Sequence, residues 1–208
     1  MTALVAENLH VFRGLRHVLQ GLSFQADAST CVQIMGANGS GKTTLLRAVA
    51  GLLEPESGRV LWQGRDTRAD RDVFHRSLGF LGHEAPLKQD LTALENIRFA
   101  ASIRRRVTSA ECASALERVG AAALADRLSR TLSAGQRRRI AFAGLTLARA
   151  KLWLLDEPQT NLDAAGQGLV LSLMREHLAE GGIVIAAVHQ EFALDSESLR
   201  RISLGGRE

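Results

Sequence analysis

A glycine-rich segment with one lysine and two threonines occupies residues 36–44, and these residue types suit a chain of phosphates. It follows the apolar run 31–35 and opens an apolar-rich stretch, an order that predicts a strand, a turn and a helix N-terminus. Glycines let backbone N–H groups converge on an anion, and the helix dipole adds positive potential. Lys42 would reach the β- and γ-phosphates, and the Thr43 hydroxyl would ligate Mg²⁺. We therefore predict a nucleoside triphosphate site, against the alternative of a turn that binds nothing, formed by Gly36, Ala37, Asn38, Gly39, Ser40, Gly41, Lys42, Thr43 and Thr44.

Two acids, Asp156 and Glu157, come directly after the apolar run 152–155. Ligands gather at the C-terminal ends of strands in open α/β sheets. We expect Asp156 to hold Mg²⁺ through its water shell and Glu157 to polarise the water that attacks the γ-phosphate. The alternative is an acidic pair that caps the next helix. His189 follows the apolar run 183–188, so it is expected at the same edge as a γ-phosphate sensor, although a histidine after a strand is often structural.

A second anion-binding turn is predicted at Ser133, Ala134, Gly135 and Gln136, called the signature turn below. Ser133 is a suitable N-cap for a helix running to Ala150, which would leave its side chain and the Gly135 N–H free for a phosphate. A plain helix cap is the alternative. Two anion sites in one small ATPase suggest that two chains share nucleotide, each offering its cap to the other's γ-phosphate.

The elements that must position these residues follow from hydrophobic periodicity. Alternation at 4–12 and 18–26 predicts two strands joined by a turn at Gly14, and Gly58 is expected to close a turn before a strand at 59–62. Further strands are predicted at 31–35, 77–81, 152–155 and 183–188, with helices at 41–52, within 92–150 and at 164–180. The apolar runs at 152–155 and 183–188 are typical of strands buried on both faces of a parallel sheet. The fold class expected is α/β, in a single domain over residues 1–208.

The composition is rich enough in apolar residues for a full hydrophobic core, and it does not point to one class of binding partner. Of 208 residues, 46% are hydrophobic and 23% charged, and the net charge of +4 suits nucleic acid, an anionic membrane or phosphate ligands. Arginines 104–106 are predicted to form a solvated helix face, with a docking patch as the alternative. Cys31 and Cys112 form no metal or disulfide pattern, which indicates reduced thiols in a cytosolic protein. No signal peptide is evident, and no apolar run approaches the roughly 18–20 residues that span a bilayer, so we expect a soluble chain.

Taken together, the segments 36–43, 132–136, 152–157 and 161–163 with His189 resemble the ATP-binding cassette ATPases over essentially the whole chain. The resemblance implies a P-loop NTPase (RecA-like) core with an N-terminal antiparallel β subdomain and an inserted helical subdomain at roughly 84–150. It implies that Phe12 stacks on adenine and that Asp163 lies in a loop linking two active sites. It also implies a head-to-tail homodimer with two ATP molecules, each held between one phosphate loop and the other chain's signature turn. Glu157, His189 and Lys42 are then the expected catalytic residues, with ATP and Mg²⁺ bound.

Three positions depart from the common pattern of this family. Ala134 replaces a glycine, which adds one methyl group, and Phe12 replaces a tyrosine while keeping the stacking face. His83 stands where most members carry a glutamine that touches Mg²⁺ and senses the membrane partner. Because neutral histidine can still donate or accept a hydrogen bond, His83 is taken as a provisional metal residue.

Segments 81–88, 91–96, 152–158, 181–185 and 200–204 look like the haem exporter A subfamily, the ATP-binding subunit of cytochrome c biogenesis. This implies a peripheral protein on the cytoplasmic face of a bacterial inner membrane, working with the integral membrane permease subunits of cytochrome c maturation. Residues 83–106 are the expected contact surface, and no nucleic acid is expected. The alternatives are an ABC ATPase for another substrate, one that acts on nucleic acid or ribosomes, and a non-enzymatic nucleotide-binding module.

Overall fold

Five parallel strands form the central sheet, in the order β6-β7-β8-β3-β9. The structure is a computed structural model that describes residues 2–194 and 199–205. A parallel order requires crossover connections, and helices supply them on both faces of the sheet. The α/β prediction is confirmed. The strands are β3 (Cys31–Met35), β6 (Leu78–Leu81), β7 (Leu152–Asp156), β8 (Ile183–Ala187) and β9 (Leu199–Ser203).

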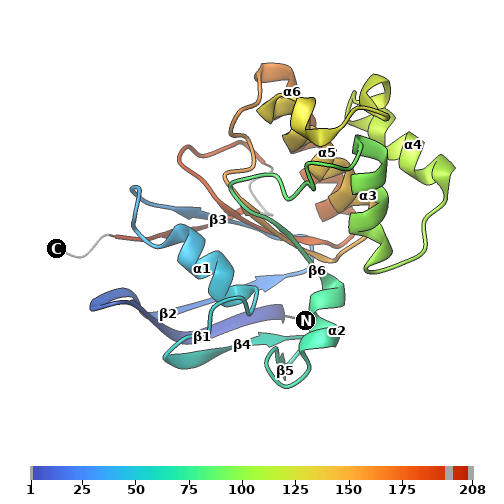
Figure 1. Ribbon diagram of the computed structural model, residues 1–208. Helices are drawn as coiled ribbons and strands as arrows, with labels where there is room; N and C mark the ends of the chain where they lie inside the picture. The colour runs from blue at the N-terminus through green and yellow to red at the C-terminus, as the bar shows by residue number, and fades with distance from the viewer. Residues whose placement is uncertain (1, 195–198, 206–208) are drawn as a thin grey trace.

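A second, antiparallel sheet in the order β2-β1-β4-β5 lies below the first (Figure 1). The hairpin strands are longer than predicted because pairing continues to Arg13 and Arg16 on either side of the turn at Gly14. The prediction for Gly58 is wrong. Gly58 lies inside β4 with φ +91°, where a Cβ would come within 2.3 Å of the Asn8 carbonyl oxygen. The strands are β1 (Thr2–Arg13), β2 (Arg16–Asp27), β4 (Ser57–Trp62) and β5 (Arg65–Asp66).

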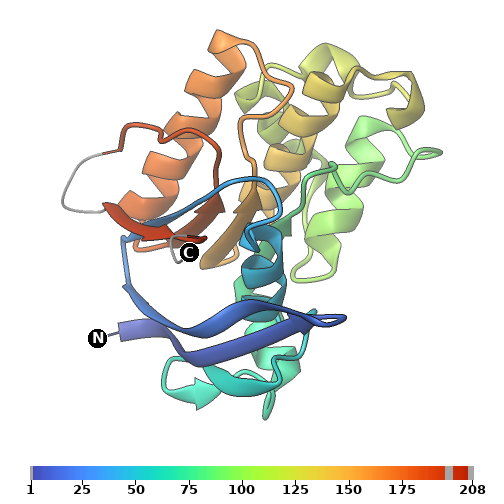
Figure 2. The ribbon, with the colours of Figure 1, turned by 90° about the vertical axis from the view of Figure 1, so that its left-hand side faces the viewer.

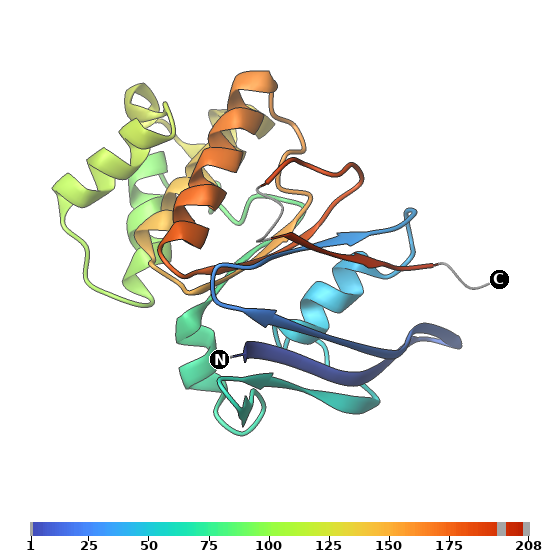
Figure 3. The same cartoon turned by 180° about the vertical axis from the view of Figure 1, so that it is seen from behind.

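Helix α1 (Lys42–Val49) is packed between the two sheets (Figure 3). It is shorter than the predicted 41–52 because Gly41 has a left-handed conformation at its N-cap and Gly51 has φ +69° just after its end. Its buried residues, among them Leu45 and Leu46, join strands of both sheets in one hydrophobic cluster. The phosphate loop is therefore attached to a helix that is enclosed on two sides.

The remaining long helices cover the opposite face of the parallel sheet (Figure 2). The helix at 133–150 is shorter than predicted and ends at Leu147, because Arg149 has φ +52°. Strand β9, strand β5 and helix α2 were not anticipated from the sequence. Among the described residues, no helix is both long and apolar enough to cross a membrane. The helices are α2 (Arg71–Ser77), α3 (Ala93–Ser102), α4 (Ser109–Arg118), α5 (Ala134–Leu147) and α6 (Ala164–Ala179), with short 3₁₀ turns η1 (Ala122–Leu124) and η2 (Ser129–Thr131).

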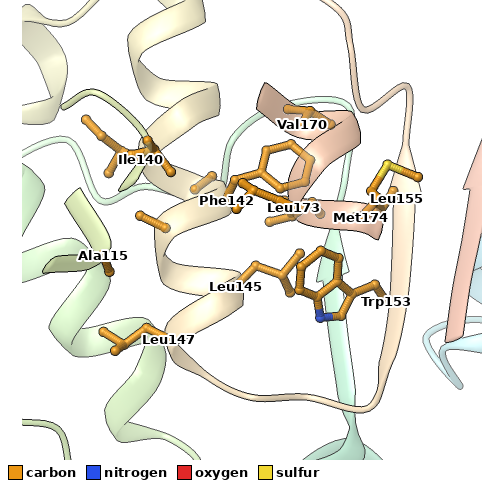
Figure 4. Close-up of a cluster of buried hydrophobic side chains, with 14 of the residues drawn as sticks. Ala115, Ile140, Phe142, Leu145, Leu147, Trp153, Leu155, Val170, Leu173 and Met174 are labelled. Atoms are coloured by element: carbon orange, nitrogen blue, oxygen red, sulfur yellow. The ribbon is translucent and has the colours of Figure 1, made fainter. Parts of the chain in front are cut away.

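Strand β7 is buried on both faces, as its continuous apolar run predicted. Trp153 and Leu155 point toward α5 and α6 (Figure 4), whereas Leu152 and Leu154 belong to the cluster around α1. Side chains alternate across a strand, so one short run serves two cores. This arrangement holds the acids that follow β7 at a rigid edge of the sheet.

The prediction that residues 104–106 form a solvated helix face is wrong. They follow the end of α3, and the half-buried Arg104 guanidinium donates to the Leu78 carbonyl oxygen. Arg105 Nε donates to the Leu147 carbonyl oxygen at 3.0 Å. These guanidinium groups satisfy carbonyl oxygens at the ends of neighbouring elements. The two cysteines are buried and free as expected, and burial raises the pKa of Cys31 to about 12.

Glu111 stabilises the start of α4 through a capping box with Thr108, in which each side chain accepts a hydrogen bond from the other residue's backbone N–H, at 2.8 and 3.2 Å. The hydrogen bonds that the carboxylate accepts from the Thr108 N–H, from the Arg105 guanidinium at 2.6 Å and from the Thr108 hydroxyl at 3.0 Å lower the pKa of Glu111 from 4.5 to about 2. A lowered pKa in the folded state contributes stability that is complete above 4.5 and is lost as the pH falls toward about 2.

We predict that Glu111→Gln lowers the free energy of unfolding at neutral pH, and that its difference from the wild type shrinks as the pH falls below 4.5. Urea unfolding at a series of pH values measures this difference. Glu117→Gln, an exposed position on the same helix, is the control and should change little. A Glu111 effect that stays constant with pH would show that the carboxylate charge is not what stabilises the helix.

Candidate active site

The phosphate loop follows β3 and folds around the ammonium group of Lys42. Lys42 Nζ donates to the carbonyl oxygens of Gly36 at 2.7 Å and Ala37 at 3.2 Å. The loop is closely packed, because a Cβ on Gly36 would come within 2.5 Å of both the Leu204 carbonyl oxygen and Ser40 Oγ. Ser40 Oγ is buried and has no hydrogen-bond partner among the residues that the structure describes. A buried polar atom without a partner inside a glycine-rich cradle fits a phosphate oxygen as its missing acceptor.

Thr43 and Asp156 meet beside this cradle although they are 113 residues apart in sequence. Thr43 Oγ1 donates to Asp156 Oδ2 at 2.8 Å, and Asp156 is buried at the end of β7. Hydroxyl and carboxylate oxygens are ligands that Mg²⁺ accepts, and it is usually held by one or two of them together with substrate phosphates. The part of the chain that the structure describes has no group of three or more His, Cys, Asp or Glu side chains arranged for a metal. The donor set therefore fits Mg²⁺ bound with a nucleotide.

Glu157 lies between two histidines. Its Oε1 is 2.5 Å from His189 Nε2, and its Oε2 is 3.3 Å from His83 Nδ1 and accepts a hydrogen bond from Thr160 Oγ1 at 3.1 Å. Its backbone N–H donates to the Ala187 carbonyl oxygen at 2.9 Å. The structure thus brings the two residues expected to act on the γ-phosphate, Glu157 and His189, into direct contact.

The carboxylate of Glu157 stays ionised at neutral pH. Partial burial alone would raise its pKa, but the hydrogen bond from Thr160 and the neighbouring His189 and His83 together hold the pKa below its ordinary value. An ionised carboxylate accepts hydrogen bonds and can orient a water molecule. It is poised to polarise a nucleophile rather than to hold a proton in the resting state.

His83 lies beside the Glu157 carboxylate rather than beside Thr43 and Asp156. It follows β6, its side chain is 60% exposed, and its Nδ1 contacts Glu157. In the described residues no hydrogen bond joins His83 to Thr43 or Asp156. The imidazole contacts Glu157 through Nδ1, and the role of His83 toward Mg²⁺ stays a prediction.

The signature turn caps α5. Ser133 Oγ accepts a hydrogen bond from the Gln136 N–H at 3.2 Å, while Gln136 Oε1 accepts one from the Ser133 N–H at 2.9 Å. The predicted cap is therefore present, and it uses one lone pair of Ser133 Oγ, while the hydroxyl proton, which a phosphate oxygen would accept, is not used by the cap. Asp163 is likewise a cap, accepting from the Gly166 N–H at 2.8 Å at the start of α6.

Arg138 is the site residue that the sequence reasoning missed. It is 3% exposed, and its guanidinium donates to four backbone carbonyl oxygens from two segments. The acceptors are those of Gly82 at 2.6 Å, Asp156 at 2.8 Å, Glu157 at 2.9 Å and Pro158 at 3.3 Å. One side chain therefore connects α5 to the backbone at and around Glu157.

Burial lowers the pKa of Arg138 to about 10, partly offset by the charges of Asp156 and Glu157. The group remains a cation at neutral pH. A signal was present, since Arg138 precedes the buried Phe142 by four residues and so lies on the inward face of α5.

Gln33 is a second residue that was missed. It is fully buried in β3, and its Nε2 donates to the Phe192 carbonyl oxygen at 2.8 Å while its Oε1 accepts from the Phe192 N–H at 3.3 Å. This pair of bonds ties the strand that feeds the phosphate loop to the segment after His189. It fixes the position of the loop that carries His189.

Phe12 is partly covered by a neighbouring histidine. Its ring stacks on that of His17 with centroids 4.1 Å apart, and His17 Nε2 lies 3.0 Å from His10 Nδ1. Phe12 nevertheless keeps 45% of its surface exposed. An aromatic surface remains available for a base, and the stacking of adenine on it stays a prediction.

The ABC transporter family matches residues 19–160 of the chain. The chain is 44% identical to the cytochrome c biogenesis ATP-binding export protein CcmA of Vibrio cholerae, covering 97% of this chain and 98% of the relative. It is 45% identical to the protein of the same name from Escherichia coli K12, covering 98% and 97%. Among solved structures it resembles a putative ABC transporter ATP-binding protein from Pyrococcus furiosus, with a TM-score of 0.84, 27% identity and 98% of each chain covered.

We predict that Gly135→Ala destabilises the chain, because a Cβ there would come within 2.6 Å of the Asn161 carbonyl oxygen. Such overpacking costs about 1–3 kcal/mol of unfolding free energy, measured by urea denaturation. The control is Gly168→Ala on α6, where nothing lies within 4 Å of the new methyl group. That variant should be neutral or stabilised by up to about 1 kcal/mol. Equal effects of the two substitutions would contradict the close approach between the signature turn and Asn161.

Proposed function

The chain belongs to the ABC transporter family, and we propose that it is the ATP-hydrolysing subunit of a membrane complex that exports haem, or releases a haem-loaded carrier, in cytochrome c biogenesis. The observation that carries the enzymatic part is the meeting of two pairs at one sheet edge, Thr43 with Asp156 and Glu157 with His189. The pathway part rests on the relatives that cover nearly the whole chain and carry the name cytochrome c biogenesis ATP-binding export protein.

In the proposed reaction the chain's own groups bind and orient the triphosphate. The backbone N–H groups of residues 36–43 and Lys42 Nζ bind the phosphates, with Lys42 exchanging its contacts to the loop carbonyls for phosphate oxygens. Thr43 and Asp156 would hold Mg²⁺, whose charge offsets that of the phosphates during bond cleavage. Glu157 accepts a hydrogen bond from the attacking water and aligns it with the terminal phosphate. His189 holds the Glu157 carboxylate and donates to the γ-phosphate.

We propose that two copies of the chain act together. The exposed Ala134 and the half-buried Gly135 lie in the first turn of α5, where backbone N–H groups have no intrahelical acceptor. With the positive end of the helix dipole, these groups suit a γ-phosphate supplied by the partner's phosphate loop. The partner contacts complete the charge stabilisation that one chain cannot supply, as an arginine finger does elsewhere.

The proposed membrane partner is an integral permease subunit. An apolar cavity of about 270 Å³ lies between β6, α3 and α5, lined by residues that include Pro86, Leu87 and Ile140. Phe99 and Ile103 at its rim are 44% and 67% exposed. A short cytoplasmic segment of a permease would cover these side chains and place the chain at the cytoplasmic face of the inner membrane. Half of the residues that line the cavity belong to the surface at 83–106 expected from the sequence, and the other half belong to β6 and to residues 140–148.

We predict that Glu157→Gln keeps MgATP binding but loses steady-state hydrolysis by at least about a hundredfold, because the amide cannot polarise the water. With bond cleavage blocked, MgATP should hold two chains together as a dimer. Phosphate release and sedimentation velocity measure the two effects. Lys42→Ala, which loses the phosphate ligand, should show neither binding nor dimer, and Glu180→Gln on the surface should behave as wild type. Hydrolysis at the wild-type rate by Glu157→Gln would disprove the assignment of the carboxylate.

We predict that Ile103→Glu prevents recruitment of the chain to membranes that contain its permease while leaving MgATP binding intact. The charge would be buried against an apolar surface in the complex but is solvated in the free chain. Leu52→Glu is the matched control, since Leu52 is 62% exposed outside the cavity. Co-sedimentation with permease-containing membranes measures recruitment. Equal binding of both variants would exclude this cavity as the docking surface.

A further inference from the structure

We propose that Arg138 is a positioning residue that couples the signature turn of each protomer to that protomer's own catalytic carboxylate. The inference rests on the proposed function, because it requires ATP hydrolysis by paired chains. It goes beyond that function by assigning a physical connection between the seam of the dimer and the chemistry of hydrolysis.

The connection begins with the stiffness of α5. Arg138 lies in the same helix as the signature turn, four residues after Ala134 and so about 6 Å along the helix axis. Over one helical turn the backbone hydrogen bonds prevent relative movement. A phosphate bound at the start of α5 therefore fixes the position of the Arg138 backbone as well.

The Arg138 guanidinium links α5 to two separate segments of the chain. Its Nη1 donates to the carbonyl oxygen of Gly82, the residue before His83, and its other nitrogens donate to the carbonyl oxygens of residues 156–158. His83 and Glu157 are thus held by neighbouring parts of one rigid planar group. The 3.3 Å contact between His83 and Glu157 depends on both segments keeping this spacing.

Glu157 needs such support because its backbone is strained. Its φ of +51° is uncommon for a residue other than glycine and persists only where the surroundings hold it. Three backbone bonds surround it in the described residues: the Ala187 carbonyl oxygen accepts the Glu157 N–H, and the Glu157 carbonyl oxygen accepts from both Arg138 and the Thr160 N–H. Removing Arg138 leaves the local turn bond from Thr160 but removes the link from this peptide to α5 and to the Gly82 carbonyl oxygen.

Burying the charge of an arginine in this space costs desolvation free energy that an apolar side chain would not cost. Within the described residues, every hydrogen bond that the Arg138 guanidinium donates goes to a backbone carbonyl oxygen, and none goes to a carboxylate. An apolar side chain of similar volume fills a core at least as favourably as a buried charge. What only a guanidinium provides here is a fixed geometry among four carbonyl oxygens, which supports a role in positioning.

The consequence for the reaction is a coupling between pairing and turnover. When the partner's nucleotide binds the signature turn, α5 is held, and Arg138 holds Glu157 in line with the nucleophilic water. In a separated protomer the hydrogen bonds of Arg138 remain, but α5 is free to shift with the rest of the 84–150 region. Binding of nucleotide to one chain's own phosphate loop does not depend on this connection.

The test compares Arg138→Lys, which keeps the charge but cannot reach four carbonyl oxygens, with Arg138→Met, which removes it. We expect kcat to fall about tenfold or more in Arg138→Lys and further in Arg138→Met, with the Kd for MgATP within about twofold of wild type. The Hill coefficient for ATP should also fall toward one. The matched control is Arg118→Lys, an exposed arginine that pairs with Glu176 between α4 and α6.

A purely structural role predicts a different result. It would lower the thermal midpoint and the folded fraction, while kcat per folded chain and the Hill coefficient stayed at wild-type values, and that outcome overturns the proposal. A parallel loss of MgATP affinity and kcat overturns it as well. If neither variant folds, hydrogen exchange on the Glu157→Gln chain decides. Trapping with MgATP should protect amides of residues 156–160 together with the first turn of α5, and protection of α5 alone contradicts the coupling.

Different experimental results would contradict the proposed function and the coupling through Arg138. If Glu157→Gln forms no MgATP-dependent dimer and the wild type releases no phosphate, the proposed function itself is wrong. If the dimer forms and the wild type turns over, but Arg138→Lys turns over equally well, only the coupling through Arg138 is wrong.

Discussion

The candidate site depends on the register of the parallel sheet. Asp156 on β7 pairs with Ala187 on β8, and Ala187 in turn pairs with Ile34 on β3, so the strands end at one level. Everything that follows those strands therefore meets at a single edge, including the phosphate loop, the two acids and both histidines. The two hydrophobic clusters on either face prevent the strands from slipping, because a shift of one residue would move Trp153 and Leu155 into the cluster on the opposite face.

At this edge the electrostatics favour a phosphate chain with a cation. Lys42 is buried and bound to loop carbonyl oxygens that a phosphate can replace, and Asp156 is buried with only a hydroxyl donor at its Oδ2. Glu157 is kept ionised by its neighbours despite partial burial. Ser40 Oγ, which has no partner in the described part of the chain, adds a further group that a phosphate oxygen could satisfy.

Several polar side chains have a partner within the chain. These are the acceptor side of Ser133, the ring nitrogen Nδ1 of His83 and the guanidinium of Arg104. Polar groups near a packed core find partners wherever geometry permits. The partners of His83 and Arg104 lie 74 and 26 residues away, so local sequence carries no record of them, whereas Ser133 and Gln136 have the local spacing of a capping box.

Glycine spacing, apolar runs and the residues that follow them were enough to determine the α/β fold and the phosphate loop, because local steric preference and strand periodicity act over a few residues. They also named Asp156, Glu157 and His189, since strands that run in parallel end at a common edge. Only the tertiary structure decided that Arg138, one of three consecutive arginines, turns inward to bind four carbonyl oxygens while its neighbours do not. Its environment is made by backbone from residues 82 and 156–158, and chain folding alone brings those segments to α5.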